Sequence, residues 1–144
     1  SLKPDAVADF CNLPIKSESV AVLVWDPPHL ADCHGSSVMK ERYGLDLVKG
    51  SSIEYWFPMF LPEAKRVLKP DGILLVKLTD GIHGGTYQWI SHHFVSACYE
   101  HSLWPCDSIV KARKHSLISS QWKKMVHARR FHCLWIVVRN SLKC

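Results

Sequence analysis

Runs of apolar residues separated by polar, glycine and proline positions predict the strands of this chain. Residues 20–25 (Val-Ala-Val-Leu-Val-Trp) and 73–78 (Ile-Leu-Leu-Val-Lys-Leu) are almost continuously apolar. Such runs are typical of buried strands in a parallel sheet, whereas half-exposed strands alternate. The same criteria predict strands over residues 6–10, 108–112 and 131–139.

Two segments have helical spacing. Residues 53–68 predict a helix that begins after a Ser52 cap and ends before a turn at 70–72. Two prolines within it predict a bend. Its apolar face comprises Ile53, Trp56, Phe57, Phe60 and Val67. Residues 87–101 predict a second helix with Trp89, Ile90, Phe94 and Val95 inward. The glycine cluster at 81–85 predicts a flexible connection. Strands alternating with helices predict an α/β fold with a mostly parallel sheet, ending in an antiparallel hairpin.

Length and composition exclude several classes. With 144 residues the chain is expected to form a single domain over residues 1–144, without a membrane-length apolar run or a signal-peptide pattern. Its six cysteines contain no C-x-x-C pair, which favours free thiols in an intracellular setting, cytoplasmic or nuclear (nucleoid). Spacings such as Cys98 to His101 do not assemble into a four-ligand zinc pattern, so we predict no metal site.

Positive charge is concentrated at one end of the chain. Residues 108–144 hold nine of the 18 lysines and arginines and none of the 13 acids, although the whole chain carries only +5. Aromatic and histidine residues interrupt the basic ones, as expected of a surface that meets phosphates and unstacked bases. A solvated basic loop that only aids solubility is the alternative. The candidate nucleic-acid contacts are Lys111, Arg113, Lys114, Lys123, Lys124, Arg129 and Arg130.

The segment after the run at 20–25 carries the candidate chemistry. It reads Asp26-Pro27-Pro28-His29, an acid and two prolines at the carboxyl end of a predicted strand, where ligands bind in open α/β sheets. Proline fixes φ, so the turn is rigid, and Asp26 is presented as a hydrogen-bond acceptor. Converging acceptors suit an amino group that must be held and polarised. A Pro-Pro turn with a solvated aspartate is the alternative.

In this order of elements the chain resembles the S-adenosylmethionine-dependent amino-methyltransferases, which modify adenine N6 or cytosine N4 in nucleic acids. The resemblance lies in an Asp-Pro-Pro motif followed by a flat ring, in Arg-Val-Leu-Lys-Pro-Asp-Gly at 66–72 before a strand, and in the basic segment between the last two strands. It implies a Rossmann-like sheet, S-adenosylmethionine as cofactor and a nucleic acid as partner, with DNA favoured over RNA.

The resemblance also implies roles for individual residues. Asp26 and the Pro27 carbonyl would accept hydrogen bonds from the amine of a flipped base, and the ring after Pro28 would stack on that base. His29 stands where the family has a larger aromatic ring. Asp9 and Phe10 match positions that meet the cofactor's adenine, although an aspartate that caps the following turn is equally compatible.

One departure from the family is clear. The family has a glycine-rich turn at the methionine end of the cofactor, but all seven glycines of this chain lie between Gly35 and Gly85. The predicted sheet is therefore incomplete, and the strand before Asp26 would expose an apolar edge. Three explanations stay open: a fragment of a longer enzyme, an enzyme completed by a homodimer or a partner chain that covers the edge, or a catalytically silent binding or scaffold subunit.

Overall fold

The computed structural model describes residues 5–27, 53–83, 86–112 and 132–141. These ranges contain a sheet of four strands in the order β1-β2-β6-β5. The strands are β1 (Val20–Trp25), β2 (Leu68–Leu78), β5 (Trp104–Ala112) and β6 (His132–Arg139).

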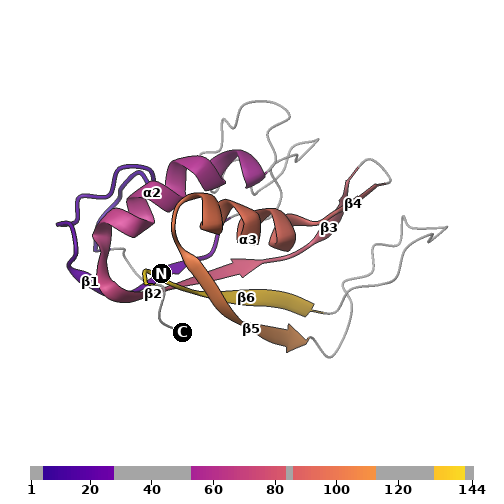
Figure 1. Ribbon diagram of the computed structural model, residues 1–144. Coiled ribbons are helices and arrows are strands. Elements are labelled where there is room, and N and C mark those ends of the chain that lie inside the picture. The colour runs from indigo at the N-terminus through magenta and orange to yellow at the C-terminus, as the bar shows by residue number, and fades with distance from the viewer. Residues whose placement is uncertain (1–4, 28–52, 84–85, 113–131, 142–144) are drawn as a thin grey trace.

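Three of the four strands of this sheet run in the same direction. β1 pairs with β2 in parallel, whereas β6 is antiparallel to both of its neighbours, β2 and β5. The carboxyl ends of β1, β2 and β5 therefore lie at the same edge of the sheet, which is on the right in Figure 1. We call this the carboxyl edge. The predicted α/β fold with a final antiparallel hairpin is thus confirmed, and the described sheet is mixed, with one parallel and two antiparallel pairings.

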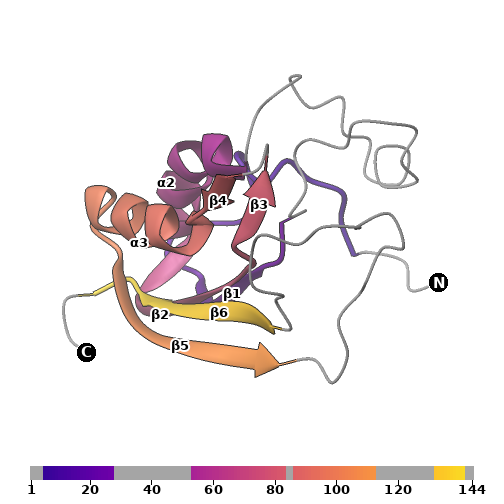
Figure 2. The same cartoon turned by 90° about the vertical axis from the view of Figure 1, so that its right-hand side faces the viewer.

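The helices cover one face of the sheet. A short 3-10 helix, η1 (Ile53–Trp56), continues into α2 (Phe57–Val67), and α3 (Ile90–Glu100) packs beside α2. Figures 1 and 2 both show α2 and α3 on the same side of the sheet. No helix of the described residues lies on the opposite side, which we call the open face. None of the described helices is long and apolar enough to cross a membrane.

Strand alternation separates the core from the open face. Leu74, Val76 and Leu78 of β2 are buried against the helices, and the register places Trp25 of β1 opposite Val76 on the same face. The predicted inner face of the first helix is confirmed, because Ile53, Trp56, Phe57, Phe60 and Val67 are all buried. The helix is interrupted, as the prolines predict, but as a 3-10 turn followed by an α-helix.

The strand at 20–25 has the predicted bounds but is not buried on both faces. β1 is an edge strand of the described sheet, and on its open face Val22 and Val24 are 52% and 56% exposed. The apolar edge expected from the incomplete family pattern is therefore present. β2 begins at Leu68, five residues before the predicted strand, because the backbone extends directly from the end of α2.

Two further sequence predictions are wrong. Residues 6–10 form no strand; Asp9 and Asn12 make an isolated bridge, and the Asp9 carboxylate accepts the backbone N–H of Cys11, which closes a turn. The second helix begins at Ile90, because the preceding residues pair as a hairpin of β3 (Gly81–His83) with β4 (Thr86–Gln88). Trp89 consequently lies outside the core and is 52% exposed.

Candidate active site

Asp26 forms an ion pair with Lys77 at the carboxyl edge. The parallel register places Trp25 opposite Val76, so the next positions, Asp26 and Lys77, face each other across the two strands. Asp26 Oδ2 lies 2.6 Å from Lys77 Nζ, and the two side chains are 49% and 25% exposed. Both project to the open face, opposite the residues that pack on the helices. The pair therefore presents a solvent-accessible carboxylate on a fixed strand end.

The Lys77 ammonium is held by a second partner. Its Nζ lies 5.9 Å from the centroid of the Trp135 ring, the residue opposite Lys77 in β6. A cation over an aromatic face is attracted by the ring quadrupole. Lys77 is thus fixed between two strands, with its charge beside Asp26.

The remaining residues of the Asp-Pro-Pro motif are described only in part. Pro27 is buried, which fixes the chain directly after Asp26. Pro28 and His29 lie outside the described residues. Asp26 and Pro27, the first two residues of the motif, therefore lie at the end of a strand, as predicted. The stacking role of His29 stays a prediction.

Trp25 anchors this strand end to the helical layer. Its ring stacks on Phe60 of α2 with centroids 3.9 Å apart and planes 24° from parallel, and it meets Phe57 edge-on at 6.3 Å. Burial of large aromatic side chains in such contacts is a major source of core stability. Because Trp25 is fixed on the helical side, its neighbour Asp26 must face the open side.

Asp9 and Phe10 lie close to the same strand end. The Phe10 ring packs 5.8 Å from Trp25, 5.5 Å from Trp56 and 6.1 Å from Phe60, and it is partly buried. The exposed Asp9 uses Oδ1 to accept the Cys11 N–H at 2.9 Å. The turn-capping alternative is thus observed for one oxygen of Asp9. The structure thus packs Phe10, one of the two candidate cofactor contacts, against Trp25, the residue before Asp26.

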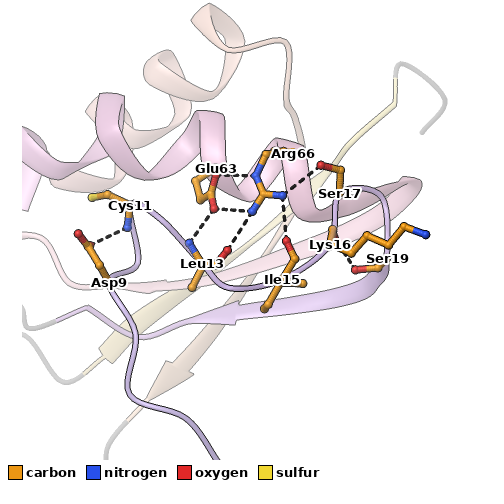
Figure 3. A network of polar contacts seen from close by, with 9 residues as sticks. All are labelled: Asp9, Cys11, Leu13, Ile15, Lys16, Ser17, Ser19, Glu63 and Arg66. Carbon is orange, nitrogen blue, oxygen red and sulfur yellow. Dashed lines mark hydrogen bonds and ion pairs between the residues drawn. The ribbon is translucent and has the colours of Figure 1, made fainter.

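A Glu63–Arg66 pair on α2 fastens the loop that follows Asp9 and Phe10 (Figure 3). Arg66 donates to both carboxylate oxygens of Glu63, at 2.6 and 2.8 Å. Its other N–H groups donate to loop acceptors at 2.9 to 3.1 Å, namely Leu13 O, Ile15 O and Ser17 Oγ. Glu63 in turn accepts the Leu13 N–H at 2.7 Å. We call this network the Arg66 clamp.

The clamp favours the charged forms of both partners. The hydrogen bond from Arg66 lowers the pKa of Glu63 below its ordinary value, and the bond to Glu63 raises the pKa of Arg66. Further along the loop, Glu18 and Ser19 donate their backbone N–H groups to the carbonyls of Arg66 and Val67 at 2.9 and 3.0 Å. The path from Phe10 to β1 is therefore tied to α2 along its length.

Asp80 lies just beyond β2, at the same edge. Its carboxylate accepts the Ser91 backbone N–H at 2.8 Å, the Ser91 hydroxyl at 3.0 Å and the Tyr87 hydroxyl at 3.3 Å. The first turn of a helix has N–H groups without intrahelical partners. Asp80 satisfies one of these groups in α3, and so joins the end of β2 to the start of α3.

Lys111 is the described member of the predicted nucleic-acid surface. It is exposed near the end of β5, and Ala112 pairs with His132 at the start of β6. Both ends of the intervening segment are thus anchored at the carboxyl edge. The other basic residues predicted to contact nucleic acid lie outside the described residues: Arg113, Lys114, Lys123, Lys124, Arg129 and Arg130.

The cysteines within the described ranges are free thiols. Cys98 is fully buried in the core, and this burial raises its pKa to about 12, so it stays a protonated apolar side chain. Within those same ranges, no cluster of three or more histidine, cysteine or acidic side chains has metal-binding geometry.

Sequence reasoning assigned no role to Lys77. Its signal was a single lysine in the otherwise apolar run at 73–78, next to the last residue of that run. A charged side chain in such a strand implies a partner of opposite charge. The alternation of side chains between the two faces, together with the parallel pairing of β1 and β2, identifies Asp26 as that partner. The Arg66 clamp had no comparable signal, because its loop acceptors are about 50 positions away in sequence.

Solved methyltransferase structures share this fold. The PvuII DNA methyltransferase (cytosine-N4-specific) superposes with a TM-score of 0.68 at 16% identity, over 93% of this chain and 48% of that protein. A protein of Thermus thermophilus named as a DNA modification methylase, in complex with S-adenosyl-L-methionine, gives 0.59 at 13% identity over 88% and 47%. The chain therefore spans about half the length of these two proteins.

A third similar structure is an S-adenosylmethionine-dependent methyltransferase from Methanosarcina mazei. It superposes with a TM-score of 0.54 at 10% identity, over 96% of this chain and 67% of that one. No protein-family model and no curated protein sequence matches the chain. At these identities the comparison establishes the fold, which is the Rossmann-like fold of S-adenosylmethionine-dependent methyltransferases, present here as a partial sheet.

The Arg66 clamp predicts a pH-dependent contribution of Glu63 to stability. Because the folded-state pKa of Glu63 is lowered, its contribution is present above the unfolded-state value of about 4.3 and is lost as the pH falls through the folded-state pKa. We expect Glu63→Gln to lower the urea midpoint at pH 7, and the difference from the wild type to be smaller at pH 3.

Glu100→Gln is the matched control, because Glu100 is exposed at the end of α3. This variant should follow the wild type at both pH values. An equal gap between wild type and Glu63→Gln at pH 7 and pH 3 would show that the loss comes from packing and not from the ionised pair.

Proposed function

We propose that this chain is the catalytic-motif part of an S-adenosylmethionine-dependent methyltransferase that acts on an exocyclic amino group of a base in nucleic acid, DNA in preference to RNA. The observation that carries the proposal is the Asp26–Lys77 pair at the carboxyl end of β1. It lies in a sheet that matches the cytosine-N4-specific PvuII enzyme over 93% of the chain. In open α/β sheets this edge binds ligands.

Asp26 would act on the amine as an acceptor. The lone pair of an exocyclic amine is delocalised into the ring, which makes the nitrogen a poor nucleophile. Hydrogen bonds from the amine to Asp26 and to the Pro27 carbonyl would hold its N–H groups out of the ring plane and localise the lone pair. Lys77, which lies against the Trp135 ring, would orient the Asp26 carboxylate.

S-adenosylmethionine supplies an electrophilic methyl group on a sulfonium when it is bound. Two described residues are candidates for one end of this cofactor. Asp9 has a second carboxylate oxygen beyond the one that caps the turn, and the next residue, Phe10, has a partly buried ring. A glycine-rich turn for the methionine end has no match in this chain, which has no glycine before Gly35. The other end of the cofactor would be held by a segment that pairs with β1.

The positive charge of the segment 113–131 supports a nucleic-acid substrate. Lys111 and both ends of the segment 113–131 lie at the edge that carries Asp26. That segment contains six lysines and arginines and no acid. Neutralisation of phosphates by such residues gives salt-dependent affinity.

A catalytically silent nucleic-acid-binding or scaffold subunit is the second candidate. It is favoured by the missing glycine-rich turn and by the exposed apolar side chains of β1, Val22 and Val24. An edge strand of this kind invites pairing with another chain, either a second copy or a different partner. Cofactor binding separates the two candidates.

Substitution of Asp26 tests the catalytic assignment. We expect Asp26→Ala to lower methyl transfer from radiolabelled S-adenosylmethionine to DNA or RNA by about 100-fold or more, because the amine loses its charged acceptor. Asp26→Asn keeps one oxygen acceptor and should retain part of the activity. Transfer that is measurable in the wild type and equal in Asp26→Ala would remove Asp26 from the mechanism.

Calorimetric titration with S-adenosylmethionine tests the incomplete cofactor site. We expect the isolated chain to bind it more weakly than about 1 mM, since only the adenine end has candidate contacts. Tight binding would show that the cofactor site is complete in this chain. Salt-dependent nucleic-acid binding without any cofactor affinity or transfer, also after a partner is added, would favour the silent subunit.

Lys77 is proposed to position the Asp26 carboxylate, and its variants should differ from the wild type in kcat and not in KM. Lys77→Met should lower kcat about tenfold and leave the KM for S-adenosylmethionine unchanged, because the charge beside Asp26 is lost while the strand packing is kept. Lys77→Arg should restore most of the activity. Lys69→Met, at an exposed position of β2, is the control. A change confined to KM would contradict this role.

A further inference from the structure

Three aromatic rings form a surface cluster where β4 meets α3. The Tyr87 and Trp89 rings lie with centroids 4.5 Å apart, and Trp89 meets His92 edge-on at 5.1 Å. Trp89 is 52% exposed and His92 is also exposed. A single exposed aromatic residue on a surface needs no explanation. Here Trp89 contacts both of the other rings, at interplanar angles of 51° to Tyr87 and 80° to His92, and its half-exposed ring is open to a ligand.

This cluster is held rigidly on the fold. The Tyr87 hydroxyl donates to Asp80 Oδ2, and Asp80 also accepts both the backbone N–H and the hydroxyl of Ser91 in the first turn of α3. Asp80 itself follows the end of β2. The Tyr87 ring is therefore tied to the strand that carries Lys77, and Trp89 packs on that ring, so less side-chain entropy remains to be lost when a ligand binds.

The cluster lies at the carboxyl edge. Asp80 comes two residues after the end of β2, and Figure 1 shows the β3–β4 hairpin beyond that end of the sheet. The two ends of the segment 113–131, Ala112 and His132, are paired at this same edge. The aromatic cluster and the ends of the segment 113–131 therefore lie at the same edge. That segment has a charge of +6 with histidines counted as neutral.

We infer that the cluster of Tyr87, Trp89 and His92 is a stacking platform for an unpaired base of the nucleic acid. Aromatic rings stack on any base, and basic residues nearby hold the phosphates between bases. A protein partner would match the apolar rings but not the segment of six positive charges anchored at the same edge. The inference rests on the proposed function, because it takes the substrate to be nucleic acid, and it adds a contact outside the Asp-Pro-Pro motif.

Binding of two oligonucleotides to the full chain separates stacking from phosphate contacts. The probes are a fluorescent single-stranded oligo(dA) and an abasic strand of equal length, which has the same phosphates but no bases. We expect the wild type to bind oligo(dA) more tightly than the abasic strand. Trp89→Ala should weaken oligo(dA) binding by about 5- to 150-fold and leave abasic binding unchanged. Trp89→Phe should retain most of the affinity.

Tyr99→Ala is the matched control. Tyr99 is 50% exposed and meets Trp104 edge-on at 5.6 Å, so it is a comparable surface ring at the other end of α3. This variant should bind both probes like the wild type. Circular dichroism and thermal unfolding of each variant show whether the fold is kept. The dependence of affinity on salt should be the same for Trp89→Ala and the wild type, because no phosphate contact is removed.

Other outcomes would overturn the inference. If Trp89→Ala binds oligo(dA) like the wild type, or loses equal affinity for both strands, the rings do not stack on bases. A change in self-association of Trp89→Ala in sedimentation, with unchanged oligonucleotide binding, would assign the cluster to a protein contact. Both of these results leave the proposed function standing. If the wild type binds neither strand at low salt, the nucleic-acid substrate itself is wrong.

Discussion

The stacking of Trp25 on Phe60 is the contact on which the candidate site depends. A strand projects successive side chains to opposite faces, so fixing one side chain in the core decides the direction of the next. With Trp25 held against α2 at 3.9 Å, Asp26 faces the open side. The parallel register then brings it to Lys77. A one-residue slip would place the carboxylate against the aromatic core, where an unpaired charge is strongly unfavourable.

The same aromatic contacts connect two segments that are distant in sequence. Phe10 packs on Trp25 and Phe60, while the Arg66 clamp fastens the loop between Phe10 and β1 to the other end of α2. Apolar packing thus fixes the loop near the carboxyl edge, and charged hydrogen bonds fix it further along. Helix α2 supplies both attachments. It therefore positions the candidate adenine contacts and the strand end that carries Asp26 as one unit.

The parts of the fold that the sequence predicts are those with local signals. The apolar run of β1 and the buried face of α2 follow from periodicity, and the Asp-Pro-Pro turn marks the strand end. Residues 6–10 were predicted wrongly because the Asp9 side chain closes a turn, which is a competing local preference. Trp89 was placed inward because the predicted helix began at Tyr87, which instead pairs with β3. The Arg66 clamp depends on tertiary proximity, which a single sequence does not reveal.

The direction of β6 decides where the two ends of the basic segment 113–131 lie. If β6 ran parallel to β5, the connection between them would have to return to the opposite edge of the sheet before the strand began. Because the two strands are antiparallel and pair from Ala112 to His132, the connection leaves and re-enters at the carboxyl edge. The reversed strand thus anchors both ends of a segment with six positive charges and no acid at the edge that carries Asp26. The strand order and directions alone thus bring the candidate amine acceptor and both ends of the basic segment to the same end of the sheet.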